Sequence, residues 1–164
     1  MNSKRTSLGL VIQGPLLSIG INGRNFKKGK SSLQNRSLTK FKCIHNIEKI
    51  INEAENRFRK IVISTWSTEE IALIKQIRGI QDSKIELVVV NDPGSRKGKY
   101  SGGHADSLDF FANNKIRQFY GKEQALKILL EEGIEFAFMM RSDQYLNIHS
   151  VYNEVLERTE ELTA

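Results

Sequence analysis

The chain alternates short, continuous apolar runs with longer segments in which apolar residues recur every three or four positions. A short apolar run bounded by turn residues predicts a buried strand, whereas the three- and four-residue spacing predicts a helix with one buried face. Strands are predicted at residues 7–13, 60–65, 84–90 and 134–140. Helices are predicted at residues 39–58, 67–78, 113–133 and 150–162, and a polar, glycine-rich loop at residues 94–110.

This order of elements predicts an α/β fold. Strands that are apolar along their whole length are typical of a parallel sheet covered by helices on both faces. We therefore expect a single α/β domain over residues 1–164, built as a Rossmann-like three-layer αβα sandwich with a mostly parallel sheet. In such sheets, ligands bind beyond the carboxyl ends of the strands.

Polar or turn-forming residues follow each of the four predicted strands, so all four groups are expected at one edge of the sheet. Each group also has an ordinary interpretation as a turn, a packed ring or a helix cap. Their coincidence at the edge where ligands bind favours a nucleotide site. The candidate residues are Gln13, Gly14 and Pro15 after the first strand, Thr65 and Trp66 after the second, Asp92 after the third, and Arg141 and Asp143 after the fourth.

The fourth strand ends in the charged sequence Arg141-Ser142-Asp143. A carboxylate at the end of a buried strand is rigidly supported, and Mg²⁺ or Mn²⁺ prefers such hard oxygen ligands together with substrate phosphates. Asp143 is therefore the predicted ligand of a divalent metal. Arg141 alternates with Asp143 along the chain and is predicted either to pair with a carboxylate or to contact phosphate.

The formal net charge of +6 is concentrated near the N-terminus, because residues 1–42 hold nine Lys and Arg and no Asp or Glu. We interpret the basic stretch over residues 24–42 as a solvated loop, with binding of an anion such as nucleotide phosphate, nucleic acid or lipid as the alternative. No apolar stretch reaches the length of a membrane helix, and residues 8–12 are too short for a signal peptide. These observations favour a cytoplasmic protein, and the single cysteine, Cys43, excludes an internal disulfide.

Five segments, "VIQGP", "VISTW", "NDPG", "NKIRQFYGKEQAL" and "MMRSDQYL", together resemble the WavE lipopolysaccharide-synthesis family in order and approximate spacing. The resemblance covers about residues 8–148 and implies a GT-A-like half of a bacterial glycosyltransferase. It implies a nucleotide-sugar donor, a saccharide acceptor, and a role in lipopolysaccharide or other surface polysaccharide synthesis. Peripheral association with the inner face of the membrane would be compatible with that role. The acceptor-binding half is expected to be absent from these 164 residues.

The same resemblance implies roles for individual residues. Gln13, Gly14, Pro15 and Asp92 would lie near the base or ribose of the donor, and Arg117 would contact its diphosphate, with Asn114 and Gln118 on the same helix. The common acidic motif of sugar-nucleotide transferases has two acids, whereas this chain has one, so its metal dependence is left open. The catalytic base is not identified among four candidates, Glu69, Glu70, Asp106 and Asp109.

The alternative function is that of a non-enzymatic nucleotide- or nucleic-acid-binding α/β module. It would account for the basic N-terminal stretch, but it gives no reason for an acid at the end of the fourth strand. For that reason nucleic acid is the less favoured partner.

Overall fold

The computed structural model describes residues 7–21, 38–91 and 105–161, with the backbone alone described for residues 18–21, 38–41, 105–117 and 160. Four parallel strands form the central sheet in the order β5-β4-β1-β6. Their bounds are Leu8–Gln13 for β1, Lys60–Trp66 for β4, Ile85–Val90 for β5 and Phe136–Arg141 for β6. The predicted α/β fold, a Rossmann-like sandwich, is confirmed.

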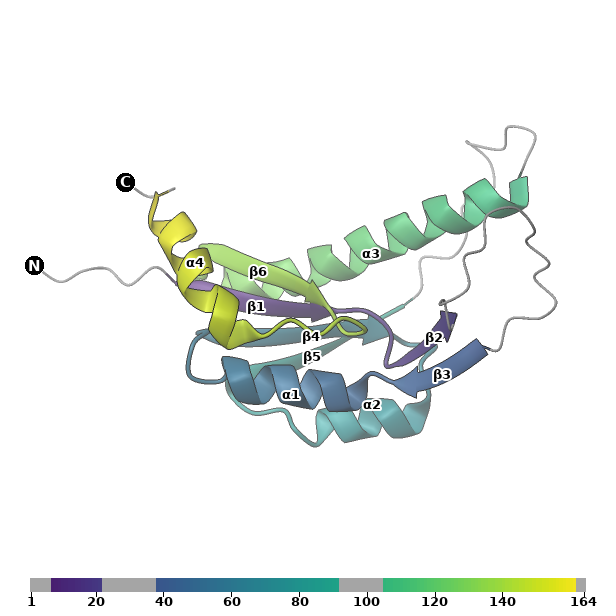
Figure 1. The fold of residues 1–164 in the computed structure, drawn as a ribbon, viewed down its shortest axis with the longest axis horizontal. Helices are drawn as coiled ribbons and strands as arrows, with labels where there is room; N and C mark the ends of the chain where they lie inside the picture. Colours follow the sequence, from purple (N-terminus) through teal and green to yellow (C-terminus); the bar gives the residue numbers. More distant parts are fainter. Residues whose placement is uncertain (1–6, 22–37, 92–104, 162–164) are drawn as a thin grey trace, which may run out of the picture.

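Helices cover the sheet on both faces, which produces three layers (Figure 1). The helix α1 (Ile44–Ala54) and the helix α2 (Ile71–Arg78) lie on one face, and α4 (Ile148–Glu161) packs on that face beside α1. The long helix α3 (Ala105–Glu131) lies on the other face. No helix in the described part of the chain combines the length and the apolarity needed to cross a bilayer.

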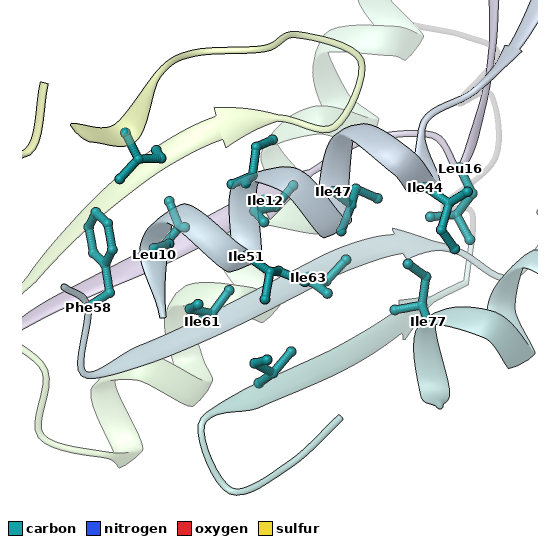
Figure 2. Close-up of a cluster of buried hydrophobic side chains, with 14 of the residues drawn as sticks. Leu10, Ile12, Leu16, Ile44, Ile47, Ile51, Phe58, Ile61, Ile63 and Ile77 are labelled. Atoms are coloured by element: carbon teal, nitrogen blue, oxygen red, sulfur yellow. The ribbon is translucent and has the colours of Figure 1, made fainter. Parts of the chain in front are cut away.

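Two hydrophobic clusters, one on each face of the sheet, hold these layers together. On the face of α1 and α2, Leu10 and Ile12 of β1 meet Ile61 and Ile63 of β4 and the isoleucine-rich side of α1 (Figure 2). On the opposite face, α3 contributes buried residues to a second cluster, which consists of Val11, Val62, Ala125, Leu129 and Ile134. Successive residues of β1 and β4 therefore enter opposite clusters, as expected for strands buried on both sides.

The order of the strands reverses at β1. The chain passes from β1 to β4 and then β5 on one side, and it returns to place β6 on the other side of β1. Such a reversal is the place where open α/β sheets bind their ligands, beyond the carboxyl ends of the strands. The carboxyl ends of β1 and β6 are therefore the expected position of a ligand site.

The predicted helix over residues 39–58 is wrong at its start. Residues Leu38–Lys42 form a strand, β3, which pairs antiparallel with β2 (Leu17–Ile21) beyond the carboxyl end of β1 (Figure 1). The helical spacing of Phe41 with Ile44 is therefore fortuitous, and α1 begins only at Ile44. The last five residues of the basic stretch, predicted as a loop, are thus a strand, and residues 24–37 of that stretch lie outside the described residues.

Two other helix starts differ from the prediction by more than two residues. The helix α2 begins at Ile71, later than predicted, with Glu70 at its N-cap position. The helix α3 begins at Ala105, so the predicted loop over residues 94–110 is wrong for residues 105–110.

Candidate functional site at the carboxyl ends of the strands

Three polar side chains form a row across the carboxyl end of the sheet. Gln13, the last residue of β1, lies beside Ser64 of β4 on one side and beside Arg141 of β6 on the other. Residues that are level with each other in a parallel sheet project from the same face, and here this is the face covered by α3. We refer to Ser64, Gln13 and Arg141 as the polar row.

Gln13 is the buried centre of the polar row, with 2% of its surface exposed. A Cβ atom added to Gly121 of α3 would lie 3.2 Å from Gln13 Nε2 and 3.2 Å from Ser64 Oγ, so this glycine lets the helix approach the row closely. Ser64 Oγ donates to the Gly121 carbonyl at 2.9 Å. Among the described residues, Gln13 Oε1 is the one buried side-chain oxygen or nitrogen that has no hydrogen-bond partner.

The turn after β1 is held by both neighbouring strands. Gly14 N donates to the Ser64 carbonyl at 3.1 Å, and Thr65 Oγ1 donates to the Gly14 carbonyl at 2.9 Å. On the β6 side, Ser142 Oγ donates to the Pro15 carbonyl at 2.7 Å. The predicted site residues Gly14, Pro15 and Thr65 are therefore brought together at one edge, where their hydrogen bonds define the shape of the turn.

Arg141 and Asp143 form a two-pronged ion pair. Arg141 Nε donates to Asp143 Oδ1 at 2.7 Å, and Arg141 Nη2 donates to Asp143 Oδ2 at 2.6 Å. These hydrogen bonds hold the pKa of Asp143 below its ordinary value, against the opposing effect of burial, and raise the pKa of Arg141. The pairing agrees with one of the two predicted roles of Arg141, and both residues carry their full charges at neutral pH.

The segment that carries Asp143 is fixed by α1. Asn46, in the first turns of α1, donates from Nδ2 to the Ser142 carbonyl at 2.7 Å and to the Gln144 carbonyl at 2.9 Å. One side-chain amide thus binds the two carbonyl groups that flank Asp143. Farther along the helix, Glu53 accepts hydrogen bonds from Tyr145 Oη at 2.7 Å and from Ile148 N at 3.0 Å.

Trp66 ends β4 and is half-buried, on the same face as Ser64. The nearby Glu69 accepts a hydrogen bond of 3.3 Å from Leu17 N, after the turn that contains Pro15. Burial raises the pKa of Glu69, although its backbone hydrogen bonds act in the opposite direction. Glu69 therefore has a packing role at this edge, which distinguishes it from the exposed Glu70.

The remaining predicted residues are less fully described. Gln118 is half-buried and lies one helical turn before Gly121, so it shares the face of α3 that meets the sheet. Asn114 and Arg117 belong to α3, but their side chains lie outside the described residues, as do those of Asp106 and Asp109. Asp92 lies outside the described residues altogether.

The described residues do not fit a metal centre. Both oxygens of Asp143 accept hydrogen bonds from Arg141, so a cation that shared this carboxylate would lie beside a guanidinium group of like charge. Within the described ranges, no three His, Cys, Asp or Glu side chains gather closely enough to hold a metal ion. The chemistry available at this edge is therefore that of arginine and amide donors, which suit an anionic, oxygen-rich ligand.

Ser64, Ser142 and Asn46 were missed by the sequence reasoning. Ser64 could have been found, because strand alternation places it on the same face as Val62 and its neighbour Thr65 on the other. Ser142 was quoted within the charged tripeptide, but its bond to Pro15 depends on strand order. Asn46 carries no local signal, since its contacts arise only when α1 packs beside β6.

No family model, no curated protein and no solved structure matches this chain. The resemblance to the WavE family therefore remains a prediction that depends on the five motifs.

Proposed function

We propose that this domain binds a nucleotide-sugar donor as the GT-A-like half of a glycosyltransferase, in the synthesis of lipopolysaccharide or another surface polysaccharide. The observation that carries the proposal is the polar row at the reversal between β1 and β6. There Gln13 and Arg141 lie side by side, next to the turn formed by Gly14 and Pro15. Ligands of open α/β sheets are bound at such reversals, and the motif resemblance supplies the class of ligand.

Glycosyl transfer needs positive groups beside the departing diphosphate. In the proposed reaction, an acceptor hydroxyl attacks the anomeric carbon, and the bond from that carbon to the diphosphate oxygen breaks. The bonding electrons leave with the diphosphate, and the proton of the hydroxyl passes to a base. Fixed positive donors stabilise the charge that develops on the diphosphate. Arg141 is the described residue suited to this role, and Arg117 is a second candidate from the resemblance.

Gln13 supports the binding part of the proposal. Its Oε1 is a buried acceptor that lacks a partner among the described residues, and leaving such an atom unsatisfied costs about 1–3 kcal/mol. A ligand N–H or O–H group that reached it would recover part of this cost. An unused acceptor beside an arginine fits a ligand that combines a polar base or ribose with phosphates.

The proposal includes the location of the protein in the cell. We place the domain in the cytoplasm, with peripheral contact to the inner face of the membrane, where a saccharide acceptor on a lipid would be met. The acceptor and the catalytic base are not assigned. Of the four acids considered, Glu69 accepts a hydrogen bond from Leu17 N and so helps to hold the turn after β1.

Isothermal titration calorimetry with UDP, GDP and CDP tests the proposal, with a short oligonucleotide as a parallel arm. Trp66→Leu is the test variant, because Trp66 is half-buried at the end of β4 beside the polar row. Leu130→Ala is the control, because Leu130 is 74% exposed on α3, close to the opposite end of the sheet. The proposal predicts that one nucleoside diphosphate binds the wild type and the control equally, and Trp66→Leu about tenfold more weakly.

Two results would contradict the proposal. One is tight binding of the oligonucleotide with no response to any nucleoside diphosphate, which would favour the non-enzymatic nucleic-acid-binding module. The other is a nucleotide affinity that Trp66→Leu and Leu130→Ala reduce equally, because the nucleotide would then not bind at this edge of the sheet.

A further inference from the structure

We propose that Arg141 binds phosphate without the help of a metal ion, and that Asp143 and Asn46 are positioning residues that hold it in place. The inference rests on the proposed function, because the diphosphate group of the donor is the phosphate that Arg141 would meet. It replaces the predicted metal-binding role of Asp143 with a different one. It also names the chemical class recognised by the site, a diphosphate.

The geometry of the ion pair leaves one edge of the guanidinium group available. Arginine has five N–H donors in a planar fork, and the edge formed by Nε and Nη2 is bound to Asp143. The two N–H groups of Nη1 and the second N–H group of Nη2 remain. Both hydrogen bonds that the Arg141 side chain makes to described residues go to Asp143. One N–H from each of these nitrogens forms a second fork, which matches two oxygens of a phosphate group.

The exposure of the two side chains is consistent with this division of roles. The Arg141 side chain is 34% exposed, whereas the Asp143 side chain is 18% exposed. Arg141 is thus the more exposed partner of the pair. In addition, the edge strand β6 lies beyond the part of the sheet that α3 contacts most closely, which is β1 and β4. A ligand can therefore approach Arg141 along the edge of the sheet.

The backbone around Asp143 is held from two directions, which fixes the carboxylate that aims the arginine. Ser142 N donates to the Gln13 carbonyl at 3.1 Å, as a continuation of the pairing between β1 and β6. Asn46 binds the carbonyls on both sides of Asp143 from the opposite layer. A rigid ion pair of this kind loses little conformational entropy when a phosphate binds, because the arginine is already oriented.

A metal ion at the same place would change this arrangement. A cation bound to Asp143 would put a like charge beside Arg141 and would weaken its hydrogen bonds to the carboxylate. The two arrangements therefore predict different effects of chelators and of substitutions, and this difference makes the inference testable.

The experiment is calorimetric titration of the whole chain with inorganic pyrophosphate, in the presence of EDTA and again with Mg²⁺. Arg141→Lys keeps the positive charge but removes the fork, so it is expected to weaken binding about tenfold to a hundredfold. The matched control is Arg158→Lys, since Arg158 also pairs with a carboxylate, Glu161, at 3.0 Å, but on α4. We expect pyrophosphate to bind in EDTA, and the control to bind like the wild type.

A spectroscopic signature separates positioning from general stability. The Nε–H signal of Arg141, assigned by its absence from Arg141→Lys, should be observable in proton–nitrogen correlation spectra because Asp143 accepts its hydrogen bond. Asp143→Asn and Asn46→Asp should each weaken or shift that signal and reduce the affinity for pyrophosphate, while the remaining amide signals stay dispersed. Thermal melting of each variant confirms that it is folded.

Several outcomes would overturn the inference. They are the absence of pyrophosphate binding at millimolar concentration, equal binding by the wild type and Arg141→Lys, and binding that disappears in EDTA, returns with Mg²⁺ and is lost in Asp143→Asn alone. Nucleoside diphosphate binding that persists in Arg141→Lys would remove this inference and leave the proposed function standing. If pyrophosphate binds at Arg141 and no nucleoside diphosphate is preferred over it, the proposed function is removed and this inference stands.

Discussion

Ser142 Oγ lies 2.7 Å from the carbonyl oxygen of Pro15, to which it donates a hydrogen bond across 127 positions of sequence. The bond joins the end of β6 to the turn that follows β1, so the two segments on either side of the strand reversal form one rigid unit. Ser142 is almost fully buried, and its hydroxyl group also lies close to Gly14. The geometry of the candidate site therefore depends on how closely these residues pack.

Gly14→Ala tests this packing. Gly14 has a φ of 147°, and an added Cβ atom would lie 2.5 Å from Ser142 Oγ. The substitution is expected to cost about 2–3 kcal/mol of unfolding free energy, because backbone strain and a steric clash add together. Gly133→Ala is the control, since Gly133 also has a positive φ, 67°, but has open space around it. It should cost about 1 kcal/mol. Urea unfolding measures both values, and equal costs would show that the contact with Ser142 is unimportant.

Asn46→Asp tests the link between α1 and the segment that carries Asp143. An aspartate cannot donate to the carbonyls of Ser142 and Gln144, and its charge would face two carbonyl oxygens. We expect a loss of about 2 kcal/mol in unfolding free energy, since two hydrogen bonds of a partly buried amide disappear. Asn52→Asp on the exposed side of the same helix is the control and should change stability little. A loss of the same size in both variants would assign the effect to charge on α1 rather than to these two bonds.

Glu69→Gln tests the pH dependence that burial imposes. The pKa of Glu69 is raised above its ordinary value of 4.5 in the folded protein, so the folded state keeps a proton that the unfolded state has already lost. Stability therefore falls as the pH rises from 4.5 through the folded-state pKa, and the loss persists above it. Glutamine cannot ionise. The variant should therefore melt at the same temperature as the wild type below pH 4.5, and at a higher temperature than the wild type at neutral pH.

The measurement for Glu69 is the difference in melting temperature between the variant and the wild type across this pH range. Taking the difference removes the contributions of all other titrating groups, which the two proteins share. The control is Glu135→Gln, which replaces an exposed glutamate before β6. A wild-type protein that gains stability relative to Glu69→Gln as the pH rises would contradict the assignment.

The sheet could be predicted from the sequence because its strands are apolar runs of ordinary length, and an all-parallel order then follows from the helices between them. The convergence of Gln13, Thr65 and Arg141 was predictable as well, because the carboxyl ends of parallel strands lie at the same edge of a sheet. Pairing of Arg141 with a carboxylate was one of its two predicted roles, but strand alternation does not account for the partner, because Asp143 lies in the turn after β6.

Other features depend on contacts between distant parts of the chain. The strand β3 was predicted as the start of a helix because its pairing with β2 is a tertiary contact, and Phe41 happens to continue the spacing of α1. Similarly, the unpartnered Oε1 of Gln13 arises because Gly121 brings α3 close to the polar row. Asp143 pairs with Arg141 because of the shape of the turn after β6. The identities of these residues do not specify that shape, so a metal ligand could not be told from an ion-pair partner.

The central claim is that a nucleoside diphosphate binds at the carboxyl ends of β1, β4 and β6, and the fluorescence of Trp66 tests it most directly. Trp66 is the only tryptophan of the chain and ends β4 at this edge, so its emission reports on the site without a label. The account predicts a saturable change in emission with at least one of UDP, GDP and CDP, and a weaker response in Arg141→Lys. Emission that stays constant with all three nucleotides would contradict it, whereas an equal response in the wild type and Arg141→Lys would contradict only the role of Arg141.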